Sequence, residues 1–207
     1  MSIFANSAGP VAGAEALSRL RAHWQELRGL RAMPRRGEIV AREIDAALPW
    51  VFIAEPVAPG VLRIRHAGRR LADMLRMEPR GMPLCAFLTP GGRAGLRPLL
   101  ASARVRPAVI EAGLVAGSGI VLPSVPARLL LLPLSEHEGA RPDCFIGGLA
   151  CGRFAPCRPL RFDLQEDALR ITPLRDGAAM PRLVASGGKR SADPGMRPAL
   201  RLVTAQG

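Results

Sequence analysis

The four cysteines are the residues of this chain best suited to bind a metal or act as nucleophiles. Cys144, Cys151 and Cys157 are separated by six and five residues, and Cys85 lies far from them. Structural zinc sites usually contain Cys-x2-Cys pairs completed by further Cys or His residues, and this spacing lacks them. We therefore predict no metal site and buried free thiols. Four cysteines in 207 residues also do not make a disulfide scaffold, so we expect a reducing, cytoplasmic location.

The three histidines lie in unrelated contexts. His23 falls within a helical pattern, His137 lies between two glutamates, and His66 ends a segment that alternates apolar and polar residues. A histidine at the end of a strand is able to ligate haem, which leaves haem open as an alternative for His66. A surface or hydrogen-bonded histidine is the simpler interpretation, and we predict no cofactor.

Enzyme motifs are missing from the sequence. It contains no Gly-x4-Gly-Lys-Ser/Thr loop, no Gly-x-Ser-x-Gly elbow and no His-Glu-x2-His pair. Ser118 lies between two glycines, but no base accompanies it. We predict that the protein is not an enzyme.

Composition indicates a packed core and a basic surface. Hydrophobic residues make up 48% of the chain, which excludes a wholly disordered protein. No uninterrupted apolar run is long enough to span a membrane, so we expect no membrane association through a helix. The net charge is +12, and residues 51–106 hold 10 arginines against 3 acidic residues. One hypothesis is therefore a nucleic-acid-associated regulatory protein that uses the Arg-rich segment 63–106. Against it, Phe87 is the only aromatic stacking group in that segment, and we favour solvated arginines.

Residues 14–30 carry the clearest helical pattern. Leu17, Leu20, Trp24 and Leu27 recur at spacings of three and four, with Leu30 after them, so they form one apolar stripe. Such a stripe packs against its own domain or against the same stripe of a second chain, and the sequence leaves both open. These four residues are our candidate surface for a protein partner or a homodimer.

Extended and helical segments follow one another in a definite order. Alternating patterns and apolar runs predict strands at 50–55, 61–66, 108–115, 127–134 and 144–150. Proline and glycine positions predict short helices at 42–48, 69–77 and 93–105. Two strands, a group of helices and three strands imply an α+β fold. We expect a five-stranded antiparallel sheet with short helices on one face, preceded by the amphipathic helix.

Composition also divides the chain into four parts. We expect a flexible leader at 1–13, a helical segment at 14–48, the sheet domain at 49–160 and a partly disordered extension at 161–207. Within the extension, residues 162–170 fit one strand or one helical turn.

Four local motifs occur in an ordered succession along the same region. They are Trp24-x3-Arg28-Gly29-x-Arg31-x2-Pro34-x-Arg36, Ile44-x3-Leu48-Pro49-x-Val51-Phe52, Arg63-Ile-Arg-His-Ala-Gly68 and Leu71-x2-Met74-Leu75-x2-Glu78-x-Arg80-Gly81. Over residues 14–160 this succession resembles the small stand-alone bacterial PAS-domain proteins common in alphaproteobacteria. Arg69 departs from that pattern, because a small Thr often follows the glycine in relatives.

The resemblance implies a sensory or regulatory module that acts through protein–protein contact, with a small-molecule ligand as a further option. A concave sheet covered by short helices is able to enclose an apolar cavity. The candidates to line such a cavity are Phe52, Ile64, His66, Leu75, Phe87, Ile110, Leu130 and Phe145. The alternative is a core filled entirely by its own side chains.

Overall fold

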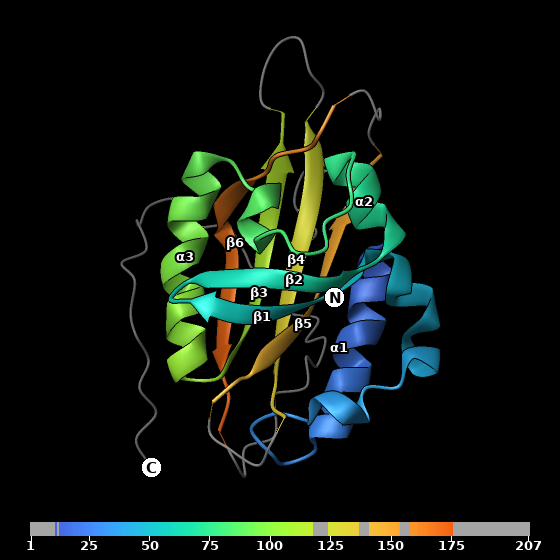
Figure 1. Ribbon diagram of the computed structural model, residues 1–207, viewed down its shortest axis with the longest axis vertical. Coiled ribbons are helices and arrows are strands. Elements are labelled where there is room, and N and C mark those ends of the chain that lie inside the picture. The colour runs from blue at the N-terminus through green and yellow to red at the C-terminus, as the bar shows by residue number, and fades with distance from the viewer. Residues whose placement is uncertain (1–10, 12, 118–123, 137–140, 154–157, 176–207) are drawn as a thin grey trace, which may run out of the picture.

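The computed structural model describes residues 11, 13–117, 124–136, 141–153 and 158–175. Its centre is an antiparallel sheet of six strands in the order β2-β1-β5-β4-β3-β6 (Figure 1). The strands are β1 (Val51–Ala58), β2 (Val61–Ala67), β3 (Ala108–Ala116), β4 (Val125–Leu134), β5 (Cys144–Cys151) and β6 (Asp163–Pro173). This confirms the α+β class and the antiparallel sheet, with one strand more than predicted.

The additional strand is β6, in the segment for which the sequence allowed a strand or a helical turn. It pairs antiparallel with β3, with Ile110 opposite Ile171 and Leu114 opposite Leu164. The sheet therefore continues past residue 160, where we expected the domain to end. The leader at 1–13, apart from residues 11 and 13, and the tail beyond 175 lie outside the described residues.

The helices predicted at 14–30, 42–48, 69–77 and 93–105 are present, and two short 3-10 helices that were not predicted, η1 (Arg36–Glu38) and η3 (Leu84–Phe87), accompany them. The predicted helices are α1 (Ala14–Arg28), η2 (Ala41–Trp50), α2 (Arg69–Leu75) and α3 (Pro90–Val105). Helix α3 begins three residues before the predicted helix, because the Thr89 hydroxyl accepts a hydrogen bond from the Gly92 N–H at 3.1 Å and caps the first turn.

The two faces of the sheet are covered by different helices. Residues of α2, η3 and α3 pack with one set of strand side chains in a single core, which we call the helical-face core. The opposite face packs against α1 and η2 in a second core, which we call the α1-face core. In Figure 1 the β1–β2 hairpin runs across the direction of the other strands, with α3 at its turn end and α2 near its other end.

Gly68 explains how the chain turns from β2 into α2. A Cβ at this position would overlap the carbonyl oxygen of Leu48 and lie 2.5 Å from the backbone of Pro49. Only glycine allows β2 to approach the end of η2 this closely.

Candidate functional site

Six of the eight predicted cavity residues meet in the helical-face core. Their side chains are 1% exposed or less, and they belong to one continuous cluster: Phe52, Ile64, Leu75, Phe87, Ile110 and Phe145. The packing is close, because a Cβ on Gly147 would overlap the Phe52 ring. At these positions the volume between sheet and helices is occupied by the protein's own side chains.

Leu130 lies on the other face of the sheet, and its assignment to the cavity is wrong. Leu129 and Leu131 belong to the helical-face core, whereas Leu130 and Leu132 belong to the α1-face core. Successive residues of a strand point to opposite faces, and an unbroken run of leucines gives no alternation from which to choose the face.

His66 lies outside the core as well. Its side chain is exposed, and it lines an open hollow of about 350 Å³ at the edge of the sheet. The hollow is lined by Arg36, Glu55, Ile64, Arg65, His66, Arg80 and Gly81. We call this feature the arginine hollow.

Electrostatics in the arginine hollow centre on one carboxylate. Glu55 of β1 accepts a hydrogen bond from Arg36 at 3.1 Å and another from Arg65 of β2 at 2.6 Å. Arg36 also donates to Glu136 at 3.3 Å. The Arg80 side chain has no hydrogen-bond or ion-pair partner among the residues that the structure describes.

Arg36 is held in place through its backbone. The Arg36 N–H donates to the carbonyl of Ser135 at 2.8 Å, and the Ser135 N–H donates to the carbonyl of Pro34 at 3.1 Å. This short parallel bridge joins the segment after α1 to the end of β4. It fixes the point from which the Arg36 guanidinium reaches Glu55.

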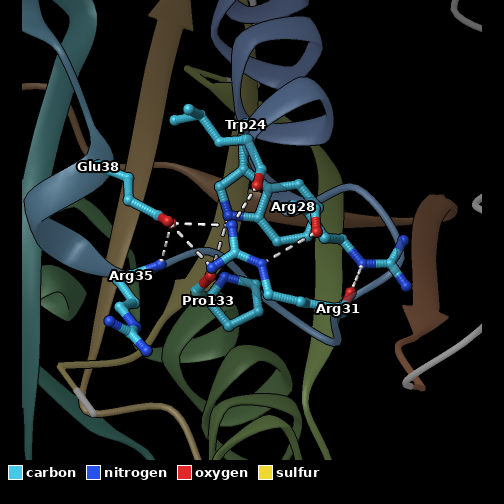
Figure 2. Close-up of polar contacts among 7 residues, drawn as sticks. Trp24, Arg28, Arg31, Arg35, Glu38 and Pro133 are labelled. Atoms are coloured by element: carbon cyan, nitrogen blue, oxygen red, sulfur yellow. Dashed lines mark hydrogen bonds and ion pairs between the residues drawn. The ribbon is translucent and has the colours of Figure 1, made fainter. Parts of the chain in front are cut away.

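The end of α1 is anchored by a second group of polar contacts (Figure 2). The Trp24 indole N–H donates to the carbonyl of Pro133 at 2.9 Å. The buried Arg28 guanidinium donates to the carbonyls of Arg31 and Ala32, and also to that of Arg175 at 3.1 Å. Arg28 therefore satisfies carbonyls beyond the helix end, where no intrahelical N–H is available.

A carboxylate completes this anchor. Two nitrogens of Arg31 donate to the two oxygens of Glu38, each at 3.0 Å, and the Arg35 N–H donates to Glu38 at 2.7 Å. The hydrogen bonds from Arg31 lower the pKa of Glu38 below its usual value. Residues of the first of the four sequence motifs thus attach the end of α1 to the rest of the domain and position Arg36 at the arginine hollow.

The apolar stripe of α1 is buried within its own chain. Leu20 and Trp24 are fully buried, Leu17 is 6% exposed and Leu27 is half-buried. Their placement disagrees with a partner or dimer surface on this stripe. The reason is that the sheet presents a second apolar face, including Leu132 of β4, which the stripe covers.

Two of the three described cysteines, Cys144 and Cys151, are buried free thiols. Burial raises the pKa of Cys144 and of Cys151 to about 12, so both remain thiols at neutral pH. Cys85 is half-buried, and Cys157 lies outside the described residues. Among the described side chains, no group of three or more His, Cys, Asp or Glu is arranged to hold a metal ion.

The Arg-rich segment 63–106 is spread over several elements. It contributes Arg63 and Arg65 to β2, Arg69 and Arg70 to α2, and further arginines to α3. Helices α2 and α3 lie at opposite ends of the β1–β2 hairpin (Figure 1). Arg70 of this segment already has partners within the chain. Its guanidinium carbon lies 5.4 Å from the centre of the Trp50 ring, and the side chain pairs with Asp73. Binding of nucleic acid stays an untested prediction.

Sequence reasoning did not select the residues of the arginine hollow other than Ile64 and His66. Arg36, Arg65, Arg80 and Gly81 occur in the motifs of the resemblance, but no motif marks them as parts of one site. The signal that could have found them is Glu55 in β1, a lone carboxylate across the predicted hairpin from alternating arginines.

A comparison with known protein families gives a match over most of the described chain. The family model described as PAS domain matches residues 13–150, which covers α1 and strands β1 to β5 except the last residue of β5. No curated protein and no solved structure matches the chain. In the described ranges, no helix is long and apolar enough to cross a membrane.

Proposed function

The chain belongs to the PAS-domain family of sensory and regulatory modules, and we propose that it is a non-enzymatic member whose output is contact with a protein partner. The observation that carries this proposal is the filled helical-face core, where six predicted cavity residues are 1% exposed or less. A ligand in that core would have to displace packed side chains, at a cost of several kcal/mol, on the order of a large core substitution. Contacts at the surface require no such rearrangement.

The segment after α1 supplies the surface that we propose for this contact. Leu30, Val40 and Leu48 are 65%, 42% and 37% exposed, and they are three of the seven large apolar side chains found exposed in the described part of the chain. A contiguous exposed apolar patch marks an interaction surface, and we infer that these three side chains of one segment form such a patch. This segment replaces the buried α1 stripe as our candidate contact region for a protein partner or a second copy.

We also propose the narrower assignments that the sequence motifs favour. These are membership in the small bacterial, alphaproteobacterial branch of the family and a cytoplasmic location. They are supported by the ordered motifs over residues 14–160 and by a chain of four dispersed cysteines.

The contact is tested by placing a photo-crosslinking amino acid at Leu30, Val40 or Leu48 in the full-length chain. Val105 of α3, which is 63% exposed, is the matched control position. We expect the first three positions to trap one partner reproducibly in the producing cell, while position 105 does not. Equal trapping at all four positions, or none at the first three, would contradict the proposal.

Native mass spectrometry with an absorbance spectrum tests the stoichiometry and the ligand. We expect the mass of the bare polypeptide, as monomer or dimer, without a visible band. A chromophore or an apolar ligand retained in the helical-face core would instead shift the output toward ligand sensing.

A further inference from the structure

The structure assigns to the arginine hollow a binding site for a small polyanion, a free molecule that carries phosphate or carboxylate groups. The hollow holds about 350 Å³, which falls within the range of roughly 300–1,000 Å³ found for small-molecule sites. It is open at the edge of the sheet and therefore accessible without any movement of the core.

The charge balance of the hollow favours an anion. Three guanidinium groups, from Arg36, Arg65 and Arg80, line it together with a single carboxylate, that of Glu55. Cations stay in excess even when Glu136, which also contacts Arg36, is counted. The planar guanidinium group donates paired hydrogen bonds that match the spacing of carboxylate and phosphate oxygens.

Two of the three arginines are already oriented. Glu55 holds Arg36 and Arg65 by hydrogen bonds of 3.1 and 2.6 Å, and the side chains of these arginines are 30% and 45% exposed. Each guanidinium has five N–H donors, so bonds to Glu55 leave further donors for a ligand. Orientation before binding lowers the entropy that a ligand must overcome.

Arg80 is the arginine whose charge is least compensated. Its side chain has no hydrogen-bond or ion-pair partner within the described residues, and its neighbour Gly81 leaves open space where a Cβ would stand. Gly81 has a φ of +83° and donates its N–H to the carbonyl of Ile64 at 2.8 Å, which fixes the turn that carries Arg80 to the hollow. His66, whose side chain is exposed, also lines the hollow.

The size and shape of the hollow favour a free small molecule over a macromolecule. The lining comes from η1, β1, β2 and the turn after α2, which meet around one confined volume. A nucleic acid would require a continuous basic path, whereas helices α2 and α3, which carry other arginines of the segment, lie at opposite ends of the β1–β2 hairpin (Figure 1). The assignment does not depend on the protein contact proposed above, because binding is measured on the isolated chain.

The test is titration calorimetry of the full-length protein with pyrophosphate and with citrate at low ionic strength. Arg80→Ala removes a lining arginine, and Arg63→Ala is the matched control. Arg63 is exposed, lies two residues from Arg65 on β2 and does not line the hollow. Neither arginine has a side-chain partner among the described residues, so both variants should fold, as circular dichroism and thermal melting will verify.

We expect Arg80→Ala to weaken binding about tenfold or more, since it removes a charge-assisted contact, and Arg63→Ala to change it by about twofold or less. Arg80→Glu should abolish binding. Tighter binding of pyrophosphate identifies phosphate as the preferred group, and tighter binding of citrate identifies carboxylates.

Three results would overturn the assignment. The first is no heat of binding for either probe at about 10 mM, where even weak sites are occupied. The second is an equal loss in Arg63→Ala and Arg80→Ala, which would indicate a diffuse basic surface. The third is a short single-stranded oligonucleotide that binds more tightly than both probes and loses affinity equally in both variants.

Discussion

The two faces of the sheet are packed in different ways. The helical-face core consists of aliphatic and aromatic side chains with one thiol, Cys151. The α1 face adds directional contacts, including the Trp24–Pro133 hydrogen bond and an ion pair between Arg21 of α1 and Glu111 of β3. All three buried polar or charged residues among those described, Arg28, Glu111 and Ser135, belong to the α1 side.

The two kinds of contact contribute differently: apolar packing contributes to the stability of the fold, and the polar contacts determine the orientation of α1. Apolar contacts stabilise in proportion to the area buried, but they are non-directional. Buried charges cost desolvation free energy, and a pair such as Arg21–Glu111 repays this only in one geometry. We infer that the helical-face core provides most of the free energy of folding, whereas the polar contacts determine where α1 lies on the sheet.

The difference between the two faces is tested most strongly by removing one large side chain from each core. Phe52→Ala and Trp24→Ala should each cost about 3–5 kcal/mol in free energy of unfolding, the usual range for a buried aromatic residue. Phe52→Ala should lower the protection of the whole sheet against hydrogen exchange. Trp24→Ala should expose α1 and its connection first, because it also removes the hydrogen bond to Pro133.

Hydrogen exchange read by mass spectrometry checks the pattern, and urea unfolding gives the magnitude. The comparison would fail if both variants lost protection uniformly, since α1 would then be part of one indivisible core.

Gly147 and Gly148, two consecutive glycines of β5, allow a second test of the difference between the two faces. A Cβ on Gly147 would overlap the Phe52 ring and lie 2.9 Å from the Leu130 carbonyl oxygen. A Cβ on Gly148, which faces α1, would overlap only the end of the Leu17 side chain, with Leu20 at 3.6 Å. We expect Gly147→Ala to destabilise by about 2–3 kcal/mol and Gly148→Ala by about 1 kcal/mol, because a leucine end moves more readily than backbone.

Urea unfolding of the two alanine variants measures this difference directly. A larger loss for Gly148→Ala would mean that α1 is held more rigidly than the helical-face core.

The sequence was informative where one physical signal dominated. Pro49, Gly60 and Gly68 punctuate the chain, and the elements between them were predicted within a few residues. The face of Leu130 was not predictable, because β4 is apolar on both faces and its alternation is invisible. The edge strand β6 was ambiguous because its exposed residues carry little hydrophobic pattern.

The candidate site was harder to predict than the fold. Apolar residues of the expected cavity were correctly identified as interior, but interior packing does not reveal whether a ligand is present. The arginine hollow depends on side chains from four elements far apart in sequence, and only the tertiary structure brings Arg36 to Glu55. The pattern of charges within one segment does not indicate which charged side chains of other segments lie next to it in the folded protein.

Alkaline pH gives a smaller effect that addresses both faces at once. Cys144 lies in the α1-face core and Cys151 in the helical-face core, and burial raises the pKa of each from 9.0 to about 12. The unfolded chain therefore releases these protons from about pH 9. The thiols' contribution to stability is fully present below pH 9 and is lost as the pH rises toward about 12.

Between pH 9 and pH 10 each thiol should remove about 1 kcal/mol from the free energy of unfolding. The chain suits this measurement, because it has no Tyr and a single lysine, Lys189, to titrate in the same range. Cys144→Ala and Cys151→Ala should each reduce the pH slope by that amount. An unchanged slope in the two alanine variants would show that the thiols are not desolvated to this degree.

The smallest expected effect concerns Glu38, the carboxylate that fastens the segment after α1. The hydrogen bonds from Arg31 lower the pKa of Glu38, so its contribution to stability is present above the unfolded value of about 4.5 and is lost as the pH falls through the folded value. The Arg31 and Glu38 side chains are 46% and 35% exposed, and solvent screening limits the pair to a few tenths of a kcal/mol. Glu38→Gln should therefore unfold at slightly lower urea than the parent protein at pH 7, and the two should converge as the pH falls through the folded pKa of Glu38 and its carboxyl becomes neutral. About 1 M salt should also remove the difference, because it screens exposed charges. A difference that persisted at low pH and in high salt would instead mean that Glu38 orients α1 through hydrogen bonds alone. Directional contacts would then hold α1 even at the exposed end of its face.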